Sequence, residues 1–273
     1  MSLASLQADA ARVAGSALIE MDDVEKRFGN GTLALQGMSL RIREGEFVSF
    51  LGPSGCGKST ALKMIAGLLS VTSGTIRVGG HPPGKGATGD DVGYVFQEAT
   101  LMPWATVFDN VYLPLRLRAV PRAEATARVR EALGMVGLSR FEGSYPRELS
   151  GGMKMRVSIA RAMVTRPRLL LMDEPFAALD EMTRFKLNND VLDLWREHGL
   201  TVIFVTHSVF ESVYLSSRVV VMAARPGRVV HDIALPGAAG RSGDYRTTPE
   251  YAENCRLVSR ALEGTMDDVD LNH

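Results

Sequence analysis

Apolar and polar positions alternate with a period of two along the first part of the chain, a pattern that predicts β-strands. Two such segments, residues 19–28 and 33–50, are bounded or interrupted by the turn signals Asn30-Gly31 and Glu44-Gly45. Shorter apolar runs predict further strands at 47–51, 75–78, 92–96, 169–172, 201–205, 219–222 and 228–233. A Gly- and Pro-rich stretch at 79–89 is expected to be a loop.

Helical spacing of apolar residues follows several of these strands. It predicts helices at 58–68, 123–136, 151–165, 180–198, 208–215 and 251–262. Strands that alternate with helices indicate an α/β protein, whose parallel sheet is covered on both faces. The helix-rich block in the middle indicates an inserted subdomain. The expected organisation is a tail at 1–17, a main domain at 18–235 with the helical subdomain at about 98–165, and a linker, short helix and acidic, disordered tail at 236–273.

Composition narrows the class of protein. Of 273 residues, 45% are apolar, and 31 basic residues balance 31 acidic ones. The zero net charge argues against a nucleic-acid binder that neutralises phosphates and against a polybasic membrane anchor. The apolar runs have strand length, so no transmembrane helix is expected, and the start of the chain lacks the pattern of a secretory signal. Two distant cysteines form neither a disulfide framework nor a metal cluster.

The strongest chemical signal is the segment GPSGCGKST between a predicted strand and a predicted helix. It matches the P-loop pattern, in which glycines let backbone N–H groups surround phosphate and the helix N-terminus adds its positive end. Lys58 would reach the β- and γ-phosphates, and the Ser59 hydroxyl would ligate Mg²⁺. The predicted nucleotide contacts are Gly52, Pro53, Ser54, Gly55, Cys56, Gly57, Lys58, Ser59 and Thr60.

A second signal is the apolar strand LLLM followed by Asp173 and Glu174. In P-loop NTPases such a strand ends at the nucleotide, where Asp173 would hold Mg²⁺ through water. Glu174 would polarise the attacking water as the general base. By itself the pattern is weak, because a strand that leads into a solvated acidic turn looks the same; the P-loop upstream gives it weight.

A third signal is the segment LSGGM before a predicted helix, where Ser150, Gly151 and Gly152 make a helix start suited to an anion. With Gln97, the segment Ala178 to Asp180, and His207, the order and spacing of these motifs over residues 19–233 resemble those of ABC ATPases. Met153 stands where the commonest family pattern has Gln. The Ser and two Gly that would touch phosphate are intact, so no loss of activity is expected from that change.

The resemblance implies a P-loop NTPase core with a RecA-like parallel sheet, an N-terminal antiparallel β subdomain and an inserted α-helical subdomain. It implies ATP and Mg²⁺ as the bound species. Gln97 would sense the γ-phosphate and the metal, so the implied metal contacts are Ser59, Gln97 and Asp173. His207 would join Glu174 as a catalytic residue. Phe28 would stack on adenine, although a core aromatic at a strand end is the alternative.

The resemblance also implies a head-to-tail homodimer, in which each ATP lies between the P-loop of one subunit and the Ser150–Gly152 signature of the other. Asp180 would contact the P-loop region of the partner. The segment after Gln97 would lie under a membrane partner, with Leu101, Met102 and Trp104 as the floor of a groove. The alternative, given equal weight, is that Trp104 packs inside the helical block.

The stretches FQEATLMPW and YLSSRVVVMAARPGRVV look like the nitrate, sulfonate and taurine branch of importer ATPases. That branch implies a separate integral-membrane permease, a periplasmic binding protein as an indirect partner, no nucleic acid, and a peripheral position on the cytoplasmic face of the inner membrane. The cargo leaves no chemistry in this chain. Two rival interpretations are a soluble ABC ATPase, for example in cluster assembly, and a P-loop kinase of a small molecule.

Cys56 lies in the P-loop beside Lys58 and a helix N-terminus, two features that lower the pKa of a thiol. We therefore expect Cys56 to react faster than Cys255 and to be protected by MgATP. The alternative is a buried, inert small residue.

Overall fold

A computed structural model describes residues 17–84 and 91–270. The described residues fall into two compact units: the first comprises 17–84 and 200–270, and the second 91–199. Residues 1–16 of the tail predicted at 1–17 lie outside the described residues, as do 85–90, which include the end of the predicted loop, and 271–273. Ala17, the last residue of the predicted tail, begins a strand. Within these described ranges, no helix has both the length and the apolar character needed to cross a membrane.

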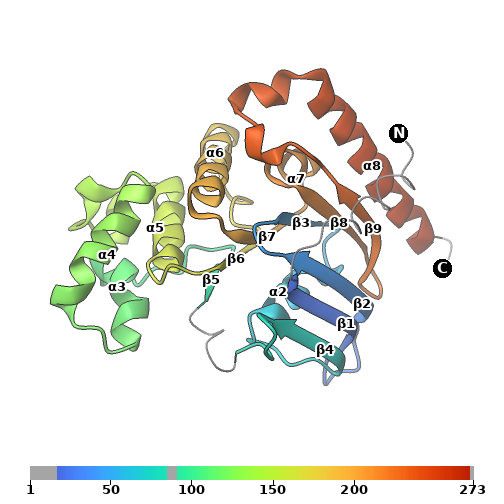
Figure 1. Ribbon diagram of the computed structural model, residues 1–273, viewed down its shortest axis with the longest axis horizontal. Coiled ribbons are helices and arrows are strands. Elements are labelled where there is room, and N and C mark those ends of the chain that lie inside the picture. The colour runs from blue at the N-terminus through green and yellow to red at the C-terminus, as the bar shows by residue number, and fades with distance from the viewer. Residues whose placement is uncertain (1–16, 85–90, 271–273) are drawn as a thin grey trace. The chain divides into compact units, whose positions relative to one another are not determined.

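The first unit contains a three-stranded antiparallel sheet in the order β2-β1-β4 (Figure 1). Its strands are β1 (Ala17–Arg27), β2 (Leu33–Arg43) and β4 (Ser73–Val78). In β2 the second half alternates between buried and exposed positions, as expected for a strand with one face on the core. The turn at Asn30-Gly31 connects β1 and β2, as the sequence predicts.

The same unit contains four strands in the order β7-β3-β8-β9. These are β3 (Phe47–Leu51), β7 (Thr201–Thr206), β8 (Arg218–Ala223) and β9 (Arg228–Ala234). Strand β3 pairs in parallel with β7 and β8, and β9 pairs antiparallel with β8. Every residue of β3 and β7 is buried, which is the property of a parallel sheet covered on both faces. The predicted α/β class is confirmed.

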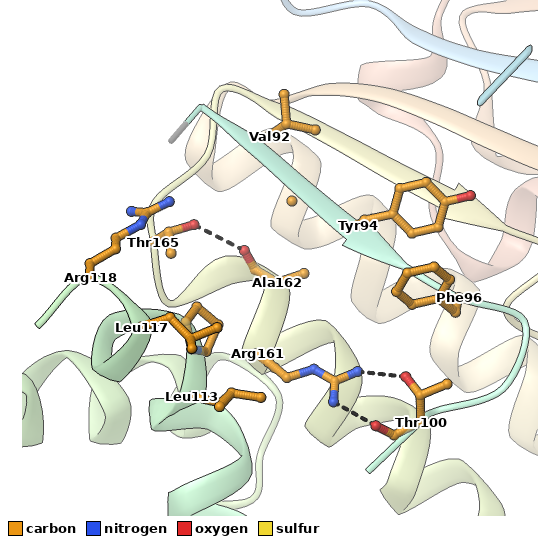
Figure 2. A pocket seen from close by; sticks show the side chains of 12 residues that line it. Val92, Tyr94, Phe96, Thr100, Leu113, Leu117, Arg118, Arg161, Ala162 and Thr165 are labelled. Carbon is orange, nitrogen blue, oxygen red and sulfur yellow. Dashed lines mark hydrogen bonds between the residues drawn. The ribbon is translucent and has the colours of Figure 1, made fainter. Parts of the chain in front are cut away.

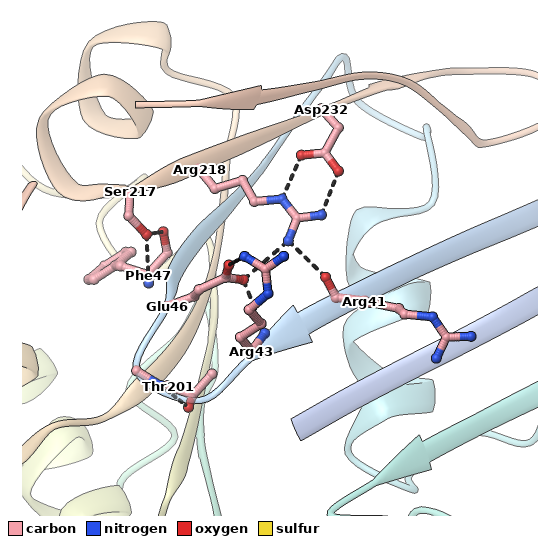
Figure 3. A network of polar contacts seen from close by, with 9 residues as sticks. Arg41, Arg43, Glu46, Phe47, Thr201, Ser217, Arg218 and Asp232 are labelled. Carbon is pink, nitrogen blue, oxygen red and sulfur yellow. Dashed lines mark hydrogen bonds and ion pairs between the residues drawn. The ribbon is translucent and has the colours of Figure 1, made fainter. Parts of the chain in front are cut away.

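A polar network holds the ends of these strands together (Figure 3). The Arg218 guanidinium donates to both carboxylate oxygens of Asp232 on β9, to Glu46 at 3.1 Å and to the carbonyl of Arg41 at 2.7 Å. The Ser217 hydroxyl accepts from the Phe47 N–H at 3.1 Å. Because Arg218 is mostly buried and its charge is matched on two sides, the network fixes the start of β3, the strand that leads into the P-loop.

In the described part of the first unit the α-helices are α2 (Lys58–Ile65), α7 (Val209–Leu215) and α8 (Pro249–Asp270). The sequence predicted the last helix at 251–262 and a disordered acidic tail after it; this is wrong, because α8 continues to Asp270. The buried guanidinium of Arg241 donates to the carbonyls of Val213 and Ser216 at 2.8 and 2.7 Å, and the Tyr251 hydroxyl donates to the carbonyl of Phe210. These bonds pack the segment before α8, and α8 itself, onto α7.

The second unit contains a parallel pair of strands, β5 (Val92–Val95) and β6 (Leu169–Asp173), in the register Tyr94 to Leu171. Its helices are α3 (Val107–Leu117), α4 (Arg122–Met135), α5 (Gly151–Met163) and α6 (Glu181–His198). Helix α3 lies in the predicted helical subdomain, but the sequence analysis predicted no separate helix at its residues; it contains Pro114, a residue that disfavours helix interiors.

Candidate functional site

The P-loop connects the buried strand β3 to helix α2 in the first unit, as the sequence predicts. Its Gly57 is the N-cap of α2 with φ 86°, a left-handed conformation that favours glycine. Gly55 is also left-handed, with φ 80°. The first N–H groups of a helix have no intrahelical partner, so the start of α2 offers donors and a positive dipole end to an anion. This geometry fits a phosphate site.

Two P-loop glycines, Gly52 and Gly57, are required by space, and Gly57 also by its backbone conformation. A Cβ atom on Gly52 would lie 2.4 Å from the carbonyl oxygen of Met222, and one on Gly57 would lie 2.6 Å from Cδ2 of Leu35. Real Cβ atoms do not approach other atoms that closely. The loop is therefore pressed against β8 on one side and β2 on the other, which holds its backbone in place.

The Lys58 ammonium group lies over the loop itself. It donates to the carbonyls of Gly52 at 2.7 Å and Pro53 at 3.0 Å, and lies 3.8 Å from the sulfur of Cys56. The side chain is 4% exposed. A primary ammonium held among P-loop carbonyls is placed to exchange those partners for phosphate oxygens.

Cys56 corrects an expectation from the sequence. It is fully buried, and burial raises the pKa of its thiol more than the neighbouring Lys58 lowers it. The expectation of a reactive thiol rested on the lysine and the helix N-terminus, and burial instead favours the stated alternative of a buried, inert residue. Burial also raises the pKa of Cys255, so neither thiol is activated.

Phe28 and His207 are the other predicted site residues of the first unit. Phe28 follows β1 in a turn closed by Gly31, is 39% exposed, and lies 5.6 Å below the Lys26 ammonium. It is therefore not a core aromatic, and its ring is available for stacking. His207 is exposed between β7 and α7. Hydrogen bonds on either side of it, from Thr206 to Glu211 at 2.6 Å and from Ser208 N–H to Thr206 at 3.0 Å, fix that turn.

In the second unit, Asp173 is the last residue of β6 and Glu174 follows it. The Asp173 carboxylate is 8% exposed and accepts a hydrogen bond from the Tyr94 hydroxyl at 3.2 Å. Glu174 has φ 44°, a left-handed conformation that costs a residue with a side chain about 1–3 kcal/mol.

The predicted signature forms the start of α5. The Ser150 hydroxyl caps the helix by accepting the Met153 N–H at 3.3 Å, so the predicted helix N-terminus is confirmed. A Cβ on Gly152 would lie 2.5 Å from Cγ2 of Thr183 in the first turn of α6. Thr183 is held in turn by Asp180, which caps α6 and accepts both the N–H and the hydroxyl of Thr183. The signature therefore packs directly on the segment that contains Asp180.

Gln97 and the segment that follows it are exposed at several positions. Trp104 is 77% exposed, which rules out the alternative that it packs inside the helical block. The turn that carries it is fixed by fully buried Asn110, whose amide accepts from Met102 N–H at 2.7 Å and donates to the carbonyls of Met102, Ala105 and Thr106. The side chain of Trp104 is therefore presented to solvent on a turn whose backbone is held by hydrogen bonds.

A pocket of about 350 Å³ lies on the second unit (Figure 2). Its apolar lining comes from β5, α3 and α5, and Arg161 closes one side by donating to Thr100 at 2.9 Å. The lining includes Tyr94, Phe96, Leu113, Pro114 and Leu117. The described lining does not include Leu101, Met102 or Trp104, so the groove floor expected at those residues is not where this pocket lies.

Two of the predicted metal contacts supply oxygen atoms of the kind that binds a magnesium ion. Ser59 in the first turn of α2 and Asp173 at the end of β6 supply hydroxyl and carboxylate oxygens, the ligands Mg²⁺ prefers. In the described part of the chain, His, Cys, Asp and Glu form no cluster of three that would hold a metal by protein ligands alone. Each of the two side chains is of a kind that binds Mg²⁺, and they belong to different units.

The predicted site residues thus divide between the two units. Phe28, the P-loop and His207 belong to the first; Gln97, the signature, Asp173 and Glu174 belong to the second. Sequence reasoning missed Tyr94 and Thr183. The signal for Tyr94 was a polar aromatic in the strand before Gln97, but its partner is 79 residues away and becomes visible only in the β5–β6 register.

Comparison with known proteins identifies the class of these motifs. Residues 35–177 match the family model described as ABC transporter. A taurine import ATP-binding protein of Rhizobium johnstonii is 44% identical, covering 88% of this chain and 93% of its own. A nitrate import ATP-binding protein of Synechocystis is 40% identical, covering 90% and 95%. Among solved structures, a dimeric bacterial ABC transporter cassette is 35% identical with a TM-score of 0.71, covering 80% and 99%.

Proposed function

Since this chain belongs to the ABC transporter family, as an ATP-binding and ATP-hydrolysing subunit of the kind that includes the taurine and nitrate import proteins, we propose that it powers an importer whose permease is a separate chain. The relatives are ATP-binding proteins of nearly the same length, which supports a separate permease. Within the chain, we assign residues 18–235 to the ATPase domain and 98–165 to its helical subdomain.

The chemistry is assigned to residues of both units. The P-loop backbone and Lys58 bind the phosphates, and Phe28 stacks on the adenine. Ser59, Asp173 and Gln97 hold Mg²⁺, which offsets the charge of the phosphate oxygens when bound. Glu174 takes the proton of the attacking water, and His207 holds that water with it. The place of Glu174 directly after Asp173, at the end of β6, supports its assignment as the base.

The subunit works as a head-to-tail homodimer with two ATP molecules at its interface. The observation that carries this proposal is the start of α5, where Ser150 caps a 13-residue helix whose first residues are the glycines of the signature. Its free N–H groups and dipole make an anion site without an anionic group in the first turn. The P-loop is already a phosphate site, so the signature serves the ATP of a second copy. A dimeric cassette among the solved relatives supports this.

The cargo is a small nutrient such as nitrate, taurine or a related sulfonate, delivered to the permease by a periplasmic binding protein. The support is the names of the relatives. The subunit then lies on the cytoplasmic face of the inner membrane, held there by the permease. The surface that meets the permease comprises the turn of Trp104, whose side chain is 77% exposed.

Trp104→Glu tests this docking surface. A charge placed on an apolar contact loses its water on binding, and an aromatic anchor is often worth about 2 kcal/mol, or about 30-fold in affinity. We expect the variant to bind ATP normally but to co-purify poorly with the multi-spanning membrane protein that the wild type recovers. Because Trp104 is 77% exposed, its replacement should leave the melting temperature unchanged.

Leu68→Glu is the matched control. Leu68 is also an exposed apolar residue, at 60%, but it lies after α2 in the first unit. Equal recovery of the membrane protein by wild type, Trp104→Glu and Leu68→Glu would show that the Trp104 turn is not the docking surface. Recovery of no membrane protein by the wild type would count against transport itself.

A further inference from the structure

The aromatic ring assigned to adenine has a buried cation over one of its faces. The Lys26 ammonium lies 5.6 Å from the centroid of the Phe28 ring, within the distance of about 6 Å at which a cation–π contact is effective. Residues two apart along a strand point to the same side, which brings the two side chains together at the end of β1. Lys26 is 8% exposed, whereas Phe28 is 39% exposed. The cation therefore covers the inner face of the ring and leaves the outer face for a base.

The segment that precedes β4 holds the lysine in this place. The Lys26 ammonium donates to the carbonyl of Ser70 at 2.6 Å. Beside this bond, the Thr72 hydroxyl accepts from Arg27 N–H at 2.9 Å, and Thr72 N–H donates to the carbonyl of Glu25 at 2.9 Å. These bonds join the end of β1 to that segment, so the ammonium group cannot turn toward solvent without losing a charge-assisted hydrogen bond.

The turn after β1 fixes the backbone that carries the ring. Phe28 N–H donates to the carbonyl of Thr32, and the Phe28 carbonyl accepts from Gly31 N–H, both at 2.9 Å. Gly31 has φ 84°, a left-handed conformation that this turn requires and that glycine adopts without strain. The turn holds the backbone of Phe28 and Lys26 holds its ring, so the stacking surface is organised before a nucleotide binds, which reduces the entropy lost on binding.

The cation also changes the electrostatics of stacking. The face of an aromatic ring is the negative part of its quadrupole, so two stacked π faces repel each other. A cation on the inner face of Phe28 draws that negative charge inward and away from the face offered to a base. Stacking on the outer face then meets less repulsion.

We propose that Lys26 is a positioning residue for the base of the nucleotide, and that it acts through Phe28. It holds the ring and makes its outer face a better surface for adenine. This inference rests on the proposed function, in which Phe28 stacks on adenine and the P-loop binds the phosphates. Lys26 should therefore affect the affinity contributed by the base and leave the affinity contributed by the phosphates unchanged.

The first test compares a ligand that has a base with one that has none. Lys26→Met removes the charge and keeps a long, unbranched side chain. Binding of ADP to the full chain in the presence of Mg²⁺ is measured by isothermal titration calorimetry, and inorganic tripolyphosphate is measured by its displacement of the fluorescent analogue MANT-ADP. We expect Lys26→Met to weaken ADP binding about 5-fold, which corresponds to about 1 kcal/mol for the lost cation–π contact. The inhibition constant of tripolyphosphate should not change.

Three further variants show whether the charge acts through the ring. Lys26→Arg returns a cation to the ring and should restore ADP binding. Arg122→Met is the matched control, because the Arg122 guanidinium lies 4.4 Å from the centroid of the Phe108 ring in the second unit, and loss of that cation–π contact should not change ADP binding. In the Phe28→Leu background, which itself should bind ADP more weakly, Lys26→Met should have no further effect, because the ring is gone.

The outcomes separate the inference from the function beneath it. If Phe28→Leu binds ADP as the wild type does, the assignment of Phe28 to adenine fails and the inference with it. If Phe28→Leu weakens ADP binding, but Lys26→Met leaves it unchanged or weakens ADP and tripolyphosphate equally, the inference is overturned while the adenine assignment stands. Should Lys26→Met fold poorly, as judged by its melting temperature, Lys26→Gln decides, because its amide can still donate to the carbonyl of Ser70 but has no charge.

Discussion

At the scale of single residues, the P-loop motif can be predicted from the sequence, but the contacts that require its glycines cannot. The glycine spacing is visible in the sequence, but the need for Gly52 comes from a carbonyl of Met222, 170 residues later, and the need for Gly57 from Leu35 on β2. Contacts with residues distant in sequence also explain why the sequence wrongly predicted a lowered thiol pKa for Cys56. Its neighbours in sequence lower the thiol pKa, and the packing of distant segments around it raises that pKa more.

The buried state of Cys56 gives a prediction opposite to the one from sequence. A raised thiol pKa means a smaller thiolate fraction at a given pH, and the thiolate is the species that reacts. Native protein at neutral pH should therefore react slowly with a thiol reagent at both Cys56 and Cys255, with or without MgATP. Both should react quickly in denaturant. Mass spectrometry after timed labelling measures this, and rapid, MgATP-protected labelling of Cys56 in the native state would contradict it.

At the scale of elements, most strands and helices were predictable because their apolar period is regular. Strands β6 and β7 were predicted to within one residue of their observed ends, since buried apolar runs there stop at charged or polar residues. The end of α8 was missed because its last turns are acidic, and the sequence alone suggested a solvated tail. The contact between α5 and α6 was also beyond the sequence, as it depends on how two helices pack.

The contact between Gly152 and Thr183 predicts that Gly152→Ala destabilises the wild type but does not destabilise the Thr183→Ser variant. In Gly152→Ala the new methyl would overlap Cγ2 of Thr183, which is stiff and held by Asp180, so overpacking should destabilise the isolated subunit by about 1–3 kcal/mol. Thr183→Ser keeps the hydroxyl and removes that methyl group. In this background Gly152→Ala should be neutral or stabilise by up to about 1 kcal/mol, because alanine is the better helix former.

Urea unfolding of the four proteins, followed by circular dichroism, measures the coupling directly. If Gly152→Ala changes the free energy of unfolding equally in both backgrounds, the signature does not pack on Thr183 in the way the structure describes.

At the scale of the whole molecule, the order of motifs was enough to identify the family, and the comparisons confirm it. The order of motifs does not by itself identify the assembly or the cargo. The proposed dimer rests on the sequence of the signature, which in that proposal binds the ATP of a second copy. The proposed cargo rests on no residue of this chain, so taurine, nitrate and their chemical relatives are a proposal drawn from similar proteins.

The central claim is that ATP holds two copies of this chain together until Glu174 hydrolyses it. Glu174→Gln keeps the shape of the side chain and removes the charge that polarises water, a contribution of about 10²- to 10⁴-fold to turnover. Size-exclusion chromatography with light scattering, with and without ATP, tests the claim. We predict that the variant is monomeric without ATP and dimeric with it, and that adding Lys58→Ala returns it to monomer. A variant that stays monomeric in saturating ATP, or that hydrolyses ATP as fast as the wild type, would contradict the account.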